Sequence, residues 1–329
     1  MGTGPVAGKR VTIRDVARSA GVSYQTVSRA LNDKPEIDAT TKQRVLDAAR
    51  ELGFRPSRFA RGLVRQDTTS IGLVIPDLLN PFFTEVASAA LEAARRRGWH
   101  VVVYDTADDP EQELSTLRVI GSQVDAIVGY LSGPADTIDT HTSGIPVVHI
   151  GRTRPGSGHG AIVVDGEQAV HAAIDHLVGT GRGMIGMLDH DRPGEPSVRQ
   201  GWFHDALRAH GRTGPVVGAA QSVDGGQRGL AALLAVQPRL DGLFTYNDVI
   251  GIGALREARR RGLDVPGELA VIGFDGLEIG TIVEPPLSSV RIDTRRLGTM
   301  AVEQVAAMLA GEPAATTVIV GELLLRGSS

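Results

Sequence analysis

Three polar side chains in the stretch VSYQTVSRALN (22–32) have types and spacing suited to hydrogen bonding with flat, polar partners. Helical periodicity places Tyr24, Gln25 and Arg29 on one face of a short helix. Glutamine pairs with adenine and arginine with guanine, so this face is suited to reading base edges in duplex DNA. The positions between them hold apolar residues that would anchor the helix to a core, namely Val22, Val27 and Leu31.

Capping and turn residues predict the helices that would hold this face in place. Thr12 can cap a first helix whose third residue is Asp15, a capping box with aspartate in place of glutamate. Gly21 permits a tight turn after that helix. Ser23 can then cap a second helix that starts at Tyr24.

The apolar residues of this region fit a small three-helix core. A third helix, from a cap at Asp38 to about Leu52, would close that core. Ala17, Gly21 and Val27 occupy the positions where two crossing helices need a small residue, a turn residue and an anchor, which is the helix-turn-helix spacing. The side chains expected to face inward are Val16, Ala17, Ala20, Val27, Leu31, Val45, Ala48, Ala49 and Leu52.

Further polar side chains lie at the start of the second helix, where helix-turn-helix motifs meet the major groove. Ser28 shares the outer face with Tyr24 and Gln25. Ser23 and Thr26 can reach phosphates, which set the register of a protein on DNA without reading sequence. Three-helix units also serve as protein-docking domains, and that is the alternative interpretation.

The distribution of charge favours DNA over a protein partner. Through Arg65 the chain has 13 Lys and Arg against 6 Asp and Glu, a net charge of +7. The whole chain carries −4, so the remainder carries −11. A basic head on an acidic body indicates that the head binds a polyanion, although a solvated basic tail would have the same charge.

Length and composition limit the class of protein. A chain of 329 residues suggests two or three domains, and 42% hydrophobic with 22% charged residues is typical of soluble globular proteins. No segment approaches the roughly 18 apolar residues of a membrane span. The first ten residues, MGTGPVAGKR, lack the apolar core of a signal peptide. The absence of cysteine excludes disulfides and thiolate metal sites, and it fits a cytoplasmic protein.

Sequence texture divides the chain into four parts. We expect a flexible tail at 1–9, a helix-turn-helix DNA-binding domain at 10–55, a linker at 56–69 and an α/β region at 70–329. In the last part, short apolar runs alternate with helical stretches, as parallel strands of an α/β sheet do. These runs are IGLVIP, WHVVVYD, VDAIVGY, IPVVHIG, AIVVD, MIGMLD, LDGLFTYND and LAVIGFD. The segments EAARRRGWHVVVYD and EARRRGLDVPGELAVIGFD resemble each other, which indicates two lobes of the same build.

Several of these predicted strands end in a polar side chain. Ligands of doubly wound sheets bind beyond the carboxyl ends of the strands, where carboxylates and amides can hold vicinal hydroxyls. Phe82 or Phe83 could stack on the apolar face of a sugar. For any single aspartate, however, a role in a turn or helix cap is the alternative, and we expect Asp248 to be a helix cap. The strand-end residues are Asp77, Asp105, Asp165, Asp189, Asn247 and Asp275.

The stretch TIRDVARSAGVSYQTVSRALN resembles the amino-terminal signature of the lac-repressor-type (LacI/GalR) transcriptional regulators. Four further motifs extend the resemblance along nearly the whole chain: NPFF at 80–83, YND at 246–248, VIGFD at 271–275 and the ending LLLRGSS. The resemblance implies an all-α helix-turn-helix head joined to a two-lobed, periplasmic-binding-protein-like body with parallel sheets. It also implies that residues 56–69 form a hinge and that residues 70–329 form an effector-binding and dimerisation domain. In that domain the chain would cross between the lobes near residues 165 and 294.

The resemblance further implies roles for particular residues. Tyr24, Gln25 and Arg29 match the residues that read the operator half-site, and Thr12 and Asn32 belong to the same DNA-binding surface. In the body, the residues that match the family's effector contacts are Arg199, Asn247 and Asp275.

By resemblance, residues 57–64 form a hinge helix only when two copies pair on DNA. Ala60 would then pack against its partner copy, Leu63 would wedge into the minor groove, and Arg58 and Arg61 would contact phosphates. Ser57 would belong to the same DNA-binding surface. Eight residues are too few for a stable isolated helix, and Gly62 weakens this one by roughly 1 kcal/mol. The alternative is a plain tether, with Leu63 packed on the body.

The predicted mechanism couples a small-molecule effector to operator binding. A homodimer would bind a pseudo-palindromic operator, and the ending at Ser329 without a heptad tail leads us to expect dimers rather than tetramers. The pocket departs from that of the lac repressor at Gly151, Ile292 and Thr294, so the identity of the ligand does not transfer. A carbohydrate is the first expectation, and a nucleobase or another small metabolite is the alternative; we expect no cofactor and no metal.

The sequence disfavours two other classes of protein, an enzyme and a periplasmic sugar-binding protein. An enzyme is disfavoured because GIGALR (251–256) lacks the third glycine of the dinucleotide fingerprint and no phosphate loop is present. A periplasmic sugar-binding protein would have a similar body, but the helix-turn-helix head and the missing signal peptide argue against it. We therefore expect a regulator and not an enzyme.

Overall fold

The computed structural model describes residues 13–31, 37–52, 68–142, 144–151, 158–192 and 196–329. The chain forms two compact units, Met1–Thr69 and Ser70–Ser329. These units are called the head and the body below, and each is described by itself.

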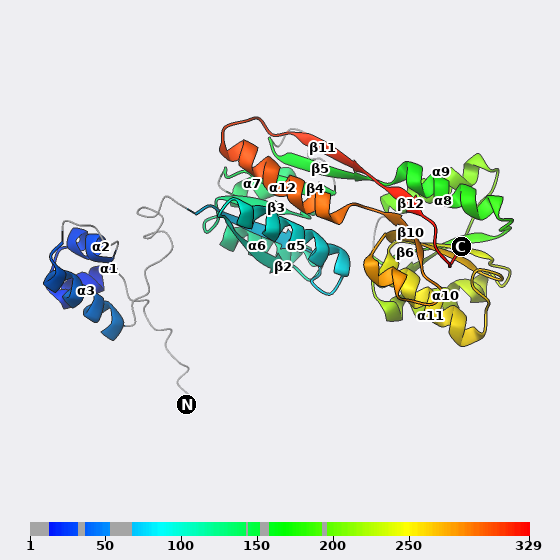
Figure 1. The fold of residues 1–329 in the computed structure, drawn as a ribbon, viewed down its shortest axis with the longest axis horizontal. Helices are drawn as coiled ribbons and strands as arrows, with labels where there is room; N and C mark the ends of the chain where they lie inside the picture. Colours follow the sequence, from blue (N-terminus) through cyan, green and yellow to red (C-terminus); the bar gives the residue numbers. More distant parts are fainter. Residues whose placement is uncertain (1–12, 32–36, 53–67, 143, 152–157, 193–195) are drawn as a thin grey trace, which may run out of the picture. The chain divides into compact units, whose positions relative to one another are not determined.

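The head contains three helices: α1 (Ile13–Ala20), α2 (Tyr24–Leu31) and α3 (Ala39–Glu51) (Figure 1). Side-chain hydrogen bonds to the first backbone N–H groups set where α2 and α3 begin. The Oγ of Ser23 accepts a hydrogen bond from the backbone N–H of Thr26 at 3.1 Å, and Oδ1 of Asp38 accepts one from Thr41 at 2.9 Å. Gly21, between α1 and α2, has a φ of +64°, which a glycine adopts without steric cost.

The core of the head largely follows the prediction. Its buried residues are Val16, Ala17, Ala20, Val27, Ala30, Val45, Ala48 and Ala49, with Val22 and Ile37 packed against them in part. The expectation that Leu52 closes this core is wrong, because its side chain is 36% exposed. Helix α3 has 13 residues against eight each for α1 and α2, so the shorter helices cover only part of its length.

The body has two six-stranded sheets (Figure 1). The first has the order β11-β5-β4-β3-β1-β2 and contains β1 (Ser70–Ile75), β2 (His100–Asp105), β3 (Ala126–Gly129), β4 (Val147–Gly151), β5 (Gly160–Asp165) and β11 (Thr316–Val320). The second has the order β12-β10-β9-β8-β6-β7 and contains β6 (Ile185–His190), β7 (Val216–Ala219), β8 (Gly242–Thr245), β9 (Ala270–Asp275), β10 (Ser288–Arg291) and β12 (Glu322–Leu324). All pairings are parallel except that of β10 with β12.

Helices pack on each sheet and complete two lobes. The first lobe holds α5 (Pro81–Arg96), α6 (Pro110–Ile120), α7 (Ala135–Thr142) and α12 (Thr294–Leu309). The second holds α8 (Glu167–Gly179), α9 (Val198–Ala209), α10 (Val223–Val236), α11 (Asp248–Arg261) and the 3-10 helix η1 (Glu278–Thr281). This architecture confirms the predicted fold class of a helical head with a two-lobed, mainly parallel α/β body.

The chain crosses between the lobes three times. It passes from β5 to α8, returns from β10 to α12, and crosses again from β11 to β12 at Gly321. Backbone hydrogen bonds join these connections: the N–H of Gly321 donates to the carbonyl of Asp165 at 2.7 Å, and that of Ile292 donates to Asp275 at 3.1 Å. The third crossing was not predicted from the sequence.

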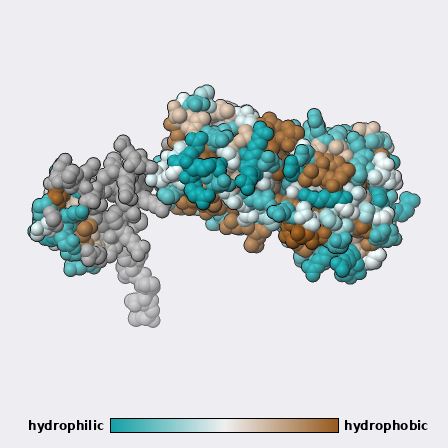
Figure 2. Space-filling model, in the orientation of Figure 1, coloured by the Kyte–Doolittle hydropathy of each residue, from teal (hydrophilic) through white to brown (hydrophobic). Residues whose placement is uncertain are grey.

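The visible face of the body is mixed in polarity. Figure 2 shows hydrophilic residues over most of the visible face of the body, interrupted by separate hydrophobic patches. Among the described helices, none is both long and apolar enough to cross a bilayer.

Candidate DNA-reading helix and candidate effector cleft

Helix α2 has one buried side and one exposed side. Val27 is fully buried and Ala30 is 2% exposed, so these two residues fix the helix to the core. Tyr24 is 54% exposed, and Gln25 and Arg29 are exposed as well. The helix therefore presents three hydrogen-bonding side chains from a rigid support, which is the geometry that direct readout of bases requires.

The start of α2 carries the two candidate phosphate contacts. The hydroxyl groups of Ser23 and Thr26 lie 2.9 Å apart, at the capped end of the helix. The amino end of a helix attracts anions because its first N–H groups lack intrahelical acceptors. The remaining predicted DNA contacts lie outside the described residues, namely Thr12, Asn32, Ser57, Arg58, Ala60, Leu63 and the side chain of Ser28.

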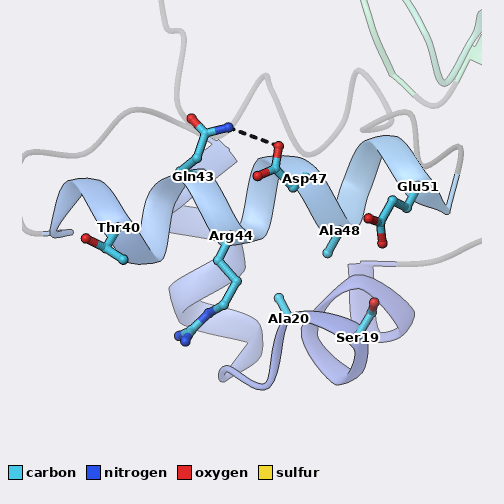
Figure 3. A pocket seen from close by; sticks show the side chains of 8 residues that line it. All are labelled: Ser19, Ala20, Thr40, Gln43, Arg44, Asp47, Ala48 and Glu51. Atoms are coloured by element: carbon cyan, nitrogen blue, oxygen red, sulfur yellow. Dashed lines mark hydrogen bonds between the residues drawn. The ribbon is translucent and has the colours of Figure 1, made fainter.

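A separate hollow of about 680 Å³ lies between the end of α1 and the length of α3 (Figure 3). Ala20 and Ala48 are its small apolar residues, and the Nε2 of Gln43 donates to Oδ1 of Asp47 at 2.9 Å across its rim. Figure 3 shows side chains from α1 and α3 around it, and none of the three reading residues of α2 lines it. This hollow is therefore not part of the candidate DNA-reading face.

In the body, Arg199 is held at the carboxyl ends of the second sheet's strands. Its guanidinium carbon lies 3.7 Å from the ring centre of Phe274 and 4.3 Å from that of Tyr246. Nη2 lies 3.6 Å from Oδ1 of Asp275, and Nη1 donates to the carbonyl of Tyr246. Stacking between two rings fixes the plane of the guanidinium, which is only 18% exposed.

Asp275 ends strand β9 in an unusual backbone conformation, with a φ of +113°. Non-glycine residues rarely adopt this region, and such conformations occur mainly at functional sites. The side chain is 3% exposed, and burial raises the pKa of its carboxyl group well above the usual value, although the charge of Arg199 opposes the shift. The sequence-predicted pair of Arg199 and Asp275 is thus brought together by the fold.

Asn247, and not Asp248, caps helix α11. Asn247 is the residue that caps α11, because Oδ1 accepts from the N–H of Ile250 at 2.9 Å. Its Nδ2 donates to Oε1 of Gln221 at 3.2 Å, so the side chain still lies at the strand ends. The expectation that Asp248 is the cap is wrong: the extended backbone that a cap needs is at Asn247, with φ −148° and ψ 170°.

Asp248 instead forms a buried junction between α11, β10 and the segment after β9. Oδ2 accepts from the N–H of Leu277 at 2.7 Å, and Oδ1 accepts from the hydroxyl of Ser289 at 2.5 Å. The side chain is fully buried, and this burial raises its pKa from 3.8 to about 7.

The first lobe contributes a cluster of aromatic rings. Phe83 packs edge-on against Phe82 at 5.5 Å and against Tyr130 at 4.9 Å between ring centres. Phe82 is 5% exposed, so it belongs to the core, whereas Phe83 is only partly buried. Of the two candidate stacking residues, Phe83 is therefore the accessible one.

Three of the strand-end aspartates hold turns. Oδ1 of Asp77 accepts from the N–H of Leu79 at 2.7 Å, and Oδ1 of Asp165 accepts from Glu167 at 3.0 Å. Asp105 accepts from the N–H groups of two residues in neighbouring turns, Leu78 and Ala107. These contacts favour the alternative structural role for Asp77 over effector binding.

An ion pair that the sequence did not suggest joins the two lobes. The Nε of Arg192 donates to Oδ2 of Asp108 at 2.6 Å, and Nη2 contacts the other carboxylate oxygen. Asp108 follows β2 and Arg192 follows β6, so the pair links the carboxyl ends of the two sheets. Both side chains remain partly exposed, at 44% for Arg192 and 33% for Asp108. In the part of the chain that is described, no group of three or more His, Asp or Glu is placed to hold a metal ion.

Comparison with known proteins assigns the class defined by this head and this body. The model of the lacI family of bacterial regulatory proteins matches residues 12–57, and that of the periplasmic binding protein-like domain matches residues 174–329. The chain is 31% identical to the catabolite control protein A of Priestia megaterium, over 85% of this chain and 87% of that protein. It is also 31% identical to the ribose operon repressor of Halalkalibacterium halodurans, over 88% and 87% of the two chains.

A solved structure agrees with these relatives. The LacI family transcriptional regulator from Arthrobacter sp. FB24 in complex with lactose is 33% identical, with a TM-score of 0.74, and the match covers 79% of this chain and 99% of that one. A helix-turn-helix head with a periplasmic-binding-protein-like body is the architecture of a transcriptional regulator. The chain belongs to the lacI family of bacterial regulatory proteins.

Proposed function

We propose that the protein is a sequence-specific, DNA-binding repressor that acts in the cytoplasm. It binds a pseudo-palindromic operator as a homodimer and responds to a small-molecule effector without catalysing a reaction. The observation that carries this proposal is α2, where exposed Tyr24, Gln25 and Arg29 oppose the buried Val27 and Ala30. Three side chains presented from one rigid helix can read a short run of base pairs.

Five residues of the proposed DNA-binding surface have individual roles. Gln25 reads an adenine and Arg29 a guanine, with Tyr24 beside them in the major groove. Ser23 and Thr26, at the capped end of α2, contact phosphates. The other members of the surface are Thr12, Ser28 and Asn32, together with the hinge residues Ser57, Arg58, Ala60 and Leu63.

The effector binds at the carboxyl ends of the strands of the body, and a carbohydrate is the proposed class. Phe83 supplies an apolar ring face, while Arg199, Asn247 and Asp275 supply fixed polar groups. Two of the similar proteins support this class by their names, one as a ribose operon repressor and one as a complex with lactose.

The effector controls DNA binding by changing the orientation of the lobes. Three crossings of the chain and the ion pair of Asp108 with Arg192 connect the lobes. A ligand that contacts both lobes therefore changes their preferred arrangement. In a dimer, this change moves the two hinge segments together or apart. A differential binding free energy of about 3 kcal/mol would change operator affinity over a hundredfold.

Two measurements on the full chain test this function. A duplex with a two-fold symmetric site, selected from a random pool, should bind far more tightly than a scrambled duplex of the same length and composition. Addition of a sugar that raises the thermal unfolding midpoint should then change the affinity for that site and leave the weak affinity for the scrambled duplex unchanged. A sugar that binds without altering operator affinity would contradict the proposed control.

A further inference from the structure

We infer that Asp189 and Tyr130 are additional effector-binding residues, and that the effector they select is uncharged and rich in hydroxyl groups. This inference rests on the proposed function, because it takes the cleft between the two lobes as the effector site. It adds two contacts to that site and a charge class for the ligand.

Asp189 is a buried carboxylate with one oxygen that has no hydrogen-bond partner among the described residues. The side chain is 3% exposed; Oδ2 accepts from the N–H of Ser197 at 3.0 Å, and Oδ1 is the atom without a partner. Strand pairing places it at the carboxyl end of β6, since Leu188 pairs with Thr245 and accepts from the N–H of Tyr246 at 2.8 Å. Asp189 therefore lies next in sequence to a residue bonded to the backbone of Tyr246, whose ring packs on Arg199.

Tyr130 provides the matching observation in the other lobe. It follows β3, its ring packs against Phe83 at 4.9 Å, and its hydroxyl is buried with no hydrogen-bond partner among the described residues. Burial raises the pKa of this phenol, and the charge of Asp275 raises it further while that of Arg199 lowers it. The hydroxyl therefore lies within electrostatic range of the second lobe.

The charged groups of the cleft disfavour the binding of an anionic ligand. Arg199 lies 3.6 Å from Asp275 and Arg192 contacts Asp108, so each of these two cations already faces a carboxyl group. Asp189 accepts its hydrogen bond from the backbone N–H of Ser197, and this neutral donor does not balance the charge of the carboxylate. A phosphate or carboxylate placed here would meet uncompensated negative charge and an oxygen that only accepts hydrogen bonds.

An uncharged polyol avoids repulsion by the carboxylate of Asp189 and supplies hydroxyl groups that donate to it. A ligand hydroxyl can donate to Oδ1 of Asp189, while the phenol of Tyr130 can donate to, or accept from, a second hydroxyl. A buried polar atom without a partner costs free energy, and a hydrogen bond to a charged group is stronger than one between neutral groups. Each atom therefore gains a partner when such a ligand binds, and the two contacts come from opposite lobes.

The test uses two conservative variants of the full chain. Tyr130→Phe removes only the hydroxyl and keeps the ring packing, and Asp189→Asn keeps an acceptor for Ser197 while it removes the charge. The matched controls are Tyr104→Phe, on β2 of the same lobe, and Asp241→Asn, whose carboxylate accepts from Gly183 and Met184 at the opposite edge of the second sheet. Calorimetric titration would measure the dissociation constants.

The probes are neutral sugars paired with their acidic counterparts: ribose with ribose 5-phosphate, glucose with glucose 6-phosphate, galactose with galacturonate, and lactose with lactobionate. We expect a neutral sugar to bind the wild type at least tenfold more tightly than its acidic partner. We expect Tyr130→Phe and Asp189→Asn each to weaken that binding about tenfold or more, with the controls unchanged.

Three results would overturn the inference. If an acidic sugar binds as tightly as its neutral partner, the charge class is wrong. If both variants bind like the wild type, the assignment of Asp189 and Tyr130 is wrong, although the proposed function stands. If no sugar of either kind binds the wild type, the carbohydrate effector of the proposed function fails together with this inference.

Discussion

Replacing the buried Asp248 by asparagine should remove a large pH dependence from the stability of the body. The carboxyl group is fully buried, and its pKa is raised from 3.8 to about 7, chiefly by burial. Since the pKa is higher in the folded state than in the unfolded state, this group stabilises the fold fully below about pH 4, and the stabilisation is lost as the pH rises through about 7. A shift of about three pH units at 1.36 kcal/mol each corresponds to about 4 kcal/mol.

Asparagine preserves the local hydrogen bonds. Its carbonyl oxygen can accept from the N–H of Leu277, and its amide can donate to the hydroxyl of Ser289, which currently donates to Asp248. The variant should therefore fold, with an unfolding free energy that changes by about 4 kcal/mol less than that of wild type between about pH 4 and about pH 8. The pKa of Asp275 is also raised, so the unfolding free energy of the variant still falls as the pH rises.

Denaturant unfolding at several pH values would measure this difference. Trp99 lies in the first lobe and Trp202 in the second, so fluorescence reports on both lobes. Asp224→Asn removes a carboxylate from the surface, where its side chain is 71% exposed, and serves as the control. If Asp248→Asn and wild type show the same pH slope, the reasoning on the buried carboxylate is refuted.

Three further predictions concern the reading helix and the cleft. Gln25→Ala should cost roughly 1–3 kcal/mol of operator affinity and relax base preference at one half-site position; a uniform loss on all duplexes would argue against a reading role. Arg199→Met removes the charge that opposes the raised pKa of buried Asp275. Where the pH is high enough for Asp275 to be ionised, the variant should therefore lower the unfolding free energy by about 3 kcal/mol. Adding Asp275→Asn should recover much of that loss, which a double-mutant cycle measures. Arg192→Ala breaks a partly exposed ion pair between the lobes, so the unfolding free energy should change by less than about 1 kcal/mol. Effector affinity should fall at low salt and match wild type at high salt, because salt screens the pair. Equal affinities of variant and wild type at low salt would show that the pair does not hold the lobes.

Features that depend on neighbouring residues could be predicted from the sequence. Ser23 and Asp38 cap helices as expected, because a cap needs only its own side chain and the next few N–H groups. Apolar periodicity identified the core of the head, but it could not show that Leu52, which directly follows α3, is exposed. The alternation of strands and helices likewise predicted the fold class of the body.

Features that depend on distant pairings were missed. Strands β11 and β12 join different sheets across Gly321, and nothing local to that residue specifies the change. The pair of Asp108 and Arg192 joins residues 84 positions apart. Asn247 and Asp248 are both good cap residues, and only the backbone conformation of the folded chain decides which one caps α11.

Selection of duplexes from a random pool by the purified full chain, followed by titration of the selected site, would measure sequence-specific operator binding. We expect a two-fold symmetric site to be enriched, and Gln25→Ala to change the base selected at the same position in both halves. Binding with equal affinity to selected and random duplexes, both with and without a sugar that the body binds, would contradict this expectation.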